Sequence, residues 1–186
     1  SLLERLADAG GVVDRERLTV RYPASLVEER IRAAPKRPFN EGPPQINAHV
    51  TISECRYMRP ETGELIRFTE DLFARVVGLA RHLNPRINVS LRGIPFVDPD
   101  IPPSLLPLAE KLYAWKYGAN PAGSIHTARL REPLLEMFQV HADATGRELK
   151  DVFKGDGHMI SPLKLARLEC ENLLFFAERG LRVRIG

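Results

Sequence analysis

Hydrophobic positions recur along the chain with two different periods, and their alternation predicts helices and short strands in turn. A clear helix signal begins at Thr69, a good N-cap residue that is followed by two acidic residues. Apolar residues then repeat at helical spacing at Leu72, Val76, Leu79, Ala80 and Leu83. This pattern predicts a helix that ends near Asn84.

From residue 88 onward, short extended runs alternate with longer segments of helical period. The extended runs predict four strands, at residues 88–94, 121–126, 156–160 and 181–185. The segments between them predict helices over residues 100–119, 131–144 and 162–180. Prolines stand near the start of each of these helices, and Gly180 is expected to end the last one.

Strands that alternate with helices favour a mostly parallel sheet. The first turn from strand to helix has neither a G-x-G-x-x-G nor a G-x-x-x-x-G-K-[ST] sequence, so the usual nucleotide-binding signature is missing. A complete (β/α)8 barrel needs about 250 residues, and this chain has 186. We therefore predict an α/β fold, with an N-terminal helical cap and the first half of a (β/α)8 TIM barrel of about four parallel strands.

Two regions are expected. Residues 1–68 form a helical cap, in which "PASLVEERIRAAP" is a helix, followed by a short β excursion. The excursion, "QINAHVTISECRYMRPETGELIRF", predicts extended runs that pair antiparallel around a turn at "PETGE". Residues 69–186 form the partial barrel with its first four units, and we expect this chain to be the N-terminal part of a longer protein.

Composition narrows the class of protein further. The net charge is only +3, and the basic residues are scattered, so nucleic acid is not an expected partner. The two cysteines, Cys55 and Cys170, have no C-x-x-C spacing, and a reducing cytoplasm is the simplest compartment. No apolar run approaches the ~20 residues that span a bilayer. These features predict a soluble cytoplasmic protein without membrane contact.

Candidate site residues follow from the architecture, because parallel α/β folds bind ligands beyond the carboxyl ends of their strands. The residues predicted to bind substrate are Phe96, Ser124, His126, Asp156 and His158. Other polar or conformationally special residues at strand ends are Arg92, Gly93, Pro95, Thr127, Ser161 and Arg184. In "GDGHMISP", strand alternation places Asp156 and His158 on one side, where they can meet His126. We expect the glycines to permit a close backbone turn there, and Ser161-Pro162 to start the next helix.

Structural interpretations of the same residues stay open. Polar side chains at strand ends also fill barrel layers, cap helices or support the sheet from beneath the helices. Ser161 before Pro162 is more typical of an N-cap than of a nucleophile. His126, His158 and Asp156 could form a zinc or iron site, although no H-E-x-x-H spacing accompanies them.

Four segments in order resemble the trimethylamine methyltransferase superfamily, which includes glycine betaine methyltransferases that lack pyrrolysine. The segments are "AGGVVDRERLTVRYPASLVEERIRAAP", "RPETGELIRFTEDLFARVVGLARHL", "DIPPSLLPLAEKLYAWKYGANP" and "ISPLKLARLECENLLFFAERGLRV". The resemblance covers nearly the whole chain and implies the N-terminal portion of a (β/α)8 barrel. In the trimethylamine enzymes, pyrrolysine lies at a position beyond residue 186.

The resemblance also implies a reaction. An N-methylated amine, trimethylamine or a quaternary amine such as glycine betaine, gives a methyl group to a cobalt corrinoid carried by a separate corrinoid protein. The chain itself would bind no cofactor or metal directly. A quaternary ammonium cannot donate a hydrogen bond, so aromatic faces and carboxylates such as Asp156 are its natural partners.

Two other functions and an assembly state remain as hypotheses. The chain could be a noncatalytic amine-binding or regulatory module of the same fold, or a metal-dependent barrel hydrolase. An apolar sheet edge left by a partial barrel predicts self-association, and hence a homo-oligomer.

Overall fold

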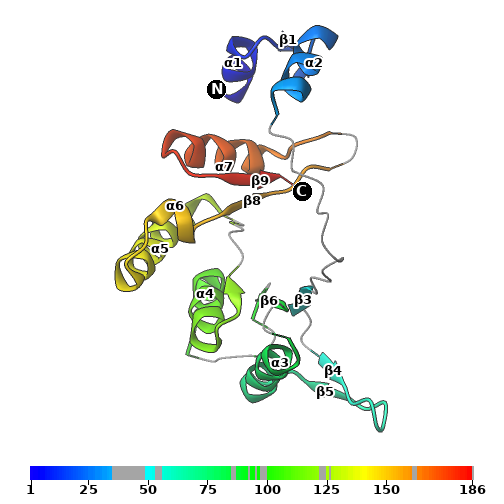
Figure 1. Ribbon diagram of the computed structural model, residues 1–186, viewed down its shortest axis with the longest axis vertical. Helices are drawn as coiled ribbons and strands as arrows, with labels where there is room; N and C mark the ends of the chain where they lie inside the picture. Colours follow the sequence, from blue (N-terminus) through cyan, green and yellow to red (C-terminus); the bar gives the residue numbers. More distant parts are fainter. Residues whose placement is uncertain are drawn as a thin grey trace. The chain divides into compact units, whose positions relative to one another are not determined.

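The computed structural model describes residues 1–34, 49–52, 56–84, 87–91, 93–94, 96, 100–121, 125, 127–160 and 163–185. The chain divides into two compact units, Ser1–Gln45 and Ile46–Gly186. The described part of the second unit is mixed α/β with parallel strand pairs (Figure 1).

The first unit combines two helices with a hairpin that the sequence pattern did not predict. Helix α1 (Leu2–Asp8) begins with a capping box between Ser1 and Glu4. Strands β1 (Val12–Asp14) and β2 (Thr19–Arg21) pair antiparallel, and α2 (Ala24–Ala33) follows. The Asp14 carboxylate accepts hydrogen bonds from the Glu16 and Arg17 backbone amides, and this local contact stabilises the turn between the two strands.

The second unit opens with the β excursion. Strands β4 (Arg56–Met58) and β5 (Leu65–Arg67) form the antiparallel hairpin predicted around "PETGE". The preceding strand, β3 (His49–Ile52), behaves differently, because it pairs parallel with β6 (Asn88–Leu91). Helix α3 (Glu70–Leu83) connects the hairpin to β6, and Thr69 caps it as predicted by accepting a hydrogen bond from the Leu72 amide.

The parallel sheet continues from β6 to β7 (Asn120–Pro121), which gives the strand order β3-β6-β7. Between these two strands, the 3-10 turn η1 (Pro103–Leu105) leads into α4 (Leu106–Tyr117). Helix α4 ends at Gly118, whose φ of 73° is the left-handed geometry that glycine adopts most easily. Apolar side chains from β3, β6, α3 and α4 form the core around this sheet.

The second half of this unit builds another parallel pair, β8 (Gly155–Gly157) with β9 (Val183–Ile185). The elements before β8 are η2 (Ala128–Leu130), α5 (Arg131–Thr145) and α6 (Leu149–Val152). Helix α7 (Arg167–Glu178) lies along the β8–β9 pair (Figure 1). Phe138, Phe153 and Phe176 pack ring against ring in the core between these helices and strands.

All four predicted strand regions thus contain a strand, and the pairs β6–β7 and β8–β9 are parallel. Within the described residues, no pairing joins β7 to β8, so closure as half of a barrel stays a prediction. Among those residues there is also no helix with the length and apolarity that a bilayer crossing requires.

Candidate functional site

Three of the five predicted substrate-binding residues lie in the described part of the chain: Phe96, Asp156 and His158. Ser124 and His126 lie outside the described residues, as do Arg92, Pro95 and Ser161. The predicted meeting of His126 with His158 therefore stays a prediction.

The glycines of β8 show which side of this strand faces the helix. A Cβ atom on Gly155 would lie 3.1 Å from the ring of Phe176, and one on Gly157 would lie 3.5 Å from the Glu169 carboxylate, both on α7. Side chains alternate along a strand, so Asp156 lies on the face opposite α7. It is half-buried there. In a layered α/β fold, this is the side on which a barrel interior would form.

His158 lies one residue beyond β8 and has an exposed side chain. Its backbone N–H donates to the Glu169 Oε2 atom at 3.3 Å. Strand β8 ends at Gly157, so His158 is the first residue after it, and the expected placement of Asp156 and His158 on one side stays a prediction. The His158 side chain after the strand is exposed, whereas the Asp156 side chain within β8 is half-buried.

Two expectations for this corner were wrong. Neither Gly155 nor Gly157 has a positive φ, so their role is close approach to α7 and not a special turn. Helix α7 begins at Arg167 and not at Pro162. Before the helix, Ile160 and Lys164 exchange two backbone hydrogen bonds and Leu163 adopts a left-handed φ of 54°, so the chain is not helical at these residues.

The corner after β6 contains a buried ion pair that the sequence analysis missed. Glu110 and Lys111, adjacent on α4, are 4% and 1% exposed. The Lys111 Nζ atom donates to Glu110 Oε1 at 2.6 Å, and the Gly93 N–H donates to Oε2 at 2.7 Å. A signal was present in the sequence, because apolar residues occur on all sides of α4 and leave no polar face for two charges.

Phe96, in the same corner, is held by other aromatic rings. Its centroid lies 4.8 Å from that of Tyr113 in an edge-to-face contact at 88°. Phe73 lies farther away, at 6.5 Å, in a tilted arrangement. Phe96 is half-buried, so its ring is packed on one side without being enclosed.

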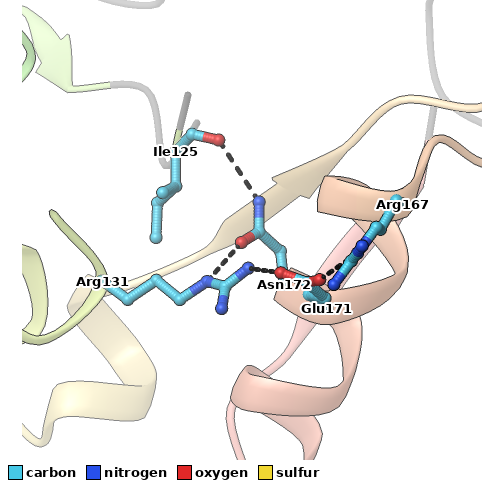
Figure 2. Close-up of polar contacts among 5 residues, drawn as sticks. All are labelled: Ile125, Arg131, Arg167, Glu171 and Asn172. Atoms are coloured by element: carbon cyan, nitrogen blue, oxygen red, sulfur yellow. Dashed lines mark hydrogen bonds and ion pairs between the residues drawn. The ribbon is translucent and has the colours of Figure 1, made fainter. Parts of the chain in front are cut away.

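A second polar cluster binds the backbone at Ile125, near the end of the second predicted strand (Figure 2). The buried Asn172 side chain of α7 donates from Nδ2 to the Ile125 carbonyl oxygen at 3.2 Å and accepts at Oδ1 from Arg131 Nε at 2.7 Å. Arg131, the first residue of α5, also donates to Glu171 at 3.0 Å. One side chain thereby connects two helices to the backbone next to Ser124 and His126.

Glu171 completes this cluster with two guanidinium partners. Arg167 donates to its Oε1 atom at 2.8 Å, and Arg131 donates to its Oε2 atom. The hydrogen bond from Arg167, and then that from Arg131, hold the pKa of the Glu171 carboxyl below its ordinary value. This cluster organises the corner; none of its members was predicted to bind substrate.

The structure gives no support for the hypothesis of a zinc or iron site among the described residues. Within the described part of the chain, no three His, Cys, Asp or Glu side chains come together in a way that could hold a metal ion. His126, which that hypothesis requires, lies outside this part.

Fold and site together define an α/β protein with parallel strand pairs, in which helix side chains hold the backbone at strand ends. No protein-family model matches the chain, and no curated protein is significantly similar to it.

Proposed function

We propose that the complete protein is a corrinoid-dependent methyltransferase that moves a methyl group from an N-methylated amine to a cobalt corrinoid protein. The observation that carries this proposal is the ordered set of four segments that resembles the trimethylamine methyltransferase superfamily. The parallel pairing of β3, β6 and β7 supports it, because the superfamily's barrel requires parallel strands.

The chain's own residues would bind and orient the amine. Asp156 carries a carboxylate on the face of β8 opposite α7, which suits attraction to a positively charged ammonium group. Phe96 offers an aromatic ring at the first corner, and such rings attract quaternary ammonium groups. His158, with Ser124 and His126, completes the proposed set of substrate-binding residues.

The partner protein's reduced cobalt supplies the nucleophile that accepts the methyl group. The chain therefore needs to hold one methyl group in line with that acceptor and to release the demethylated amine. Asp156 and Phe96 suit this task, since a carboxylate and an aromatic face can both attract an ammonium group without covalent bonding. We further propose that the protein works in the cytoplasm as a homo-oligomer.

Methyl transfer to the corrinoid protein tests the proposal directly. The full-length protein is mixed with the reduced corrinoid protein and either glycine betaine or trimethylamine, and cobalt methylation is followed by its absorption spectrum. Transfer that depends on both the protein and the amine supports the enzyme. Amine binding without transfer supports the noncatalytic module, and stoichiometric zinc or iron that is lost on changing His126 or His158 supports the hydrolase.

A further inference from the structure

The contact between α4 and the corner after β6 joins a buried charge pair to a backbone amide. Glu110 uses both carboxylate oxygens, one for the Gly93 N–H and one for the Lys111 ammonium. Lys111 is 1% exposed, and its positive charge compensates the buried carboxylate. The pair therefore presents a strong, fixed hydrogen-bond acceptor to the loop.

Stability alone does not explain this arrangement. Replacing a buried ion pair with apolar side chains of similar size is often neutral or stabilising, because removing two charges from water is costly. The pair instead fixes one peptide group. Gly93 has a φ of 86°, so the backbone turns sharply at the point that Glu110 holds.

Helix α4 also contacts Phe96, which lies three residues after Gly93 in the sequence. Tyr113 packs edge-to-face against Phe96, while Glu110 binds Gly93. Residues three apart lie on the same side of a helix, so Glu110 and Tyr113 act as neighbouring supports. Together they restrict both ends of the segment from Gly93 to Phe96.

We propose that Glu110 and Lys111 are positioning residues that set the Phe96 ring for amine binding. This inference rests on the proposed function, in which Phe96 contacts the amine. Glu110 acts through the Gly93 amide, and Lys111 acts through Glu110. Neither side chain is proposed to touch the substrate, because both are buried within the packing of α4.

Two double variants separate the acceptor from the charges. Glu110→Gln with Lys111→Met removes both charges but keeps a carbonyl oxygen that can accept from Gly93. Glu110→Met with Lys111→Met removes the charges and the acceptor. Both pairs avoid leaving one buried charge alone, which is the change most damaging to folding.

The measurements are amide hydrogen exchange at Gly93, NMR signals of the Phe96 ring, and the dissociation constant for glycine betaine. Relative to the Gln/Met variant, we expect the Met/Met variant to exchange Gly93 at least about tenfold faster. We also expect shifted Phe96 signals and about tenfold weaker betaine binding, because the ring is no longer held in place. The wild-type chain gives a test without substitution, since its Gly93 amide must exchange more slowly than in the unfolded chain.

Unprotected Gly93 in the wild type, or identical Phe96 signals and betaine affinity in the two double variants, would overturn the positioning role. Failure of the proposed function has a different signature. In that case the wild-type full-length protein does not bind glycine betaine, while Gly93 exchange and the Phe96 signals still decide whether Glu110 positions the ring.

Discussion

Gly155 lacks the Cβ atom that would press against α7, so the backbone of β8 lies close to this helix. An alanine Cβ at this position would lie 3.1 and 3.2 Å from two ring carbons of Phe176. Phe176 is fully buried, so the ring has little room to move. An added Cβ atom would therefore require the strand, the helix or the Phe176 ring to shift by a few tenths of an ångström.

Gly155→Ala should therefore destabilise the protein by about 1–3 kcal/mol through overpacking. The matched control is Gly157→Ala, whose Cβ would meet its nearest atom at an ordinary 3.5 Å. We expect the control to change stability by less than about 1 kcal/mol, since alanine also reduces the freedom of the unfolded chain. Urea unfolding of both variants checks this, and equal losses would contradict the steric explanation.

His158 offers a test of function at the residue scale. Its side chain is exposed and only its backbone amide is bonded, so His158→Ala should leave thermal stability nearly unchanged. In the complete enzyme we expect methyl transfer to fall at least about tenfold, or ~1.4 kcal/mol of transition-state stabilisation. His82→Ala, a change at another exposed histidine, serves as the control. Normal transfer by His158→Ala would place the site elsewhere.

At the scale of elements, α7 depends on one buried amide side chain. Asn172 joins this helix to Ile125 and to Arg131 of α5. Asn172→Leu would leave the Ile125 carbonyl and the Arg131 guanidinium without this partner, which should cost about 2–3 kcal/mol. Arg167→Ala is the control, because its side chain is 92% exposed and its loss should cost less than about 1 kcal/mol.

The unfolding free energies from urea titrations separate these two variants. A loss for Asn172→Leu no larger than that for Arg167→Ala would show that the hydrogen bonds of Asn172 (Figure 2) contribute little to holding α5 and α7 together.

The same cluster predicts a dependence of stability on pH. Folding lowers the pKa of Glu171 from its ordinary 4.5, chiefly through Arg167 and then through Arg131. A lowered carboxyl pKa stabilises the fold above the ordinary pKa, and this stability is lost as the pH falls through the folded-state pKa. The difference in unfolding free energy between wild type and Glu171→Gln should thus be largest at neutral pH. It should disappear as the pH falls below 4.5 and Glu171 becomes protonated. A difference that does not change with pH would contradict the ion-pair explanation.

Elements also differ in how far local sequence decides their ends. Helix α3 begins after Thr69 as predicted, because the hydroxyl bonds an amide three residues away in the same segment. Helix α7 begins five residues later than predicted, at Arg167, because the Ile160–Lys164 turn comes first. The helix-start signal of Ser161-Pro162 was local, whereas the Ile160–Lys164 backbone pairing is a contact that periodicity does not show.

For the whole molecule, exposed apolar side chains predict association between copies. Leu79 and Leu83 lie four residues apart on α3 and are 58% and 68% exposed. Adjacent exposed leucines favour burial against another surface. We expect sedimentation velocity to show concentration-dependent association, and Leu79→Glu with Leu83→Lys to reduce it while keeping the helix. A monomer at every concentration would contradict the expected homo-oligomer.

The sequence alone predicted most of the helices and extended segments, although it did not predict the β1–β2 hairpin. Periods of apolar residues, the Thr69 cap and Gly180 after α7 act within one segment, so their physical effect can be predicted locally. It also placed strands in the right four regions. Assignment of the reaction rests on the resemblance of four segments and remains a proposal.

Only the tertiary structure decided that β3 joins the parallel sheet and which side chains hold the corners. Every strand offers the same backbone N–H and C=O groups, so periodicity could not show that β3 joins β6 in parallel. The contacts of Glu110 with Gly93 and of Asn172 with Ile125 join residues 17 and 47 positions apart. Such contacts depend on how helices pack against sheets, and packing is fixed by the whole set of buried side chains at once.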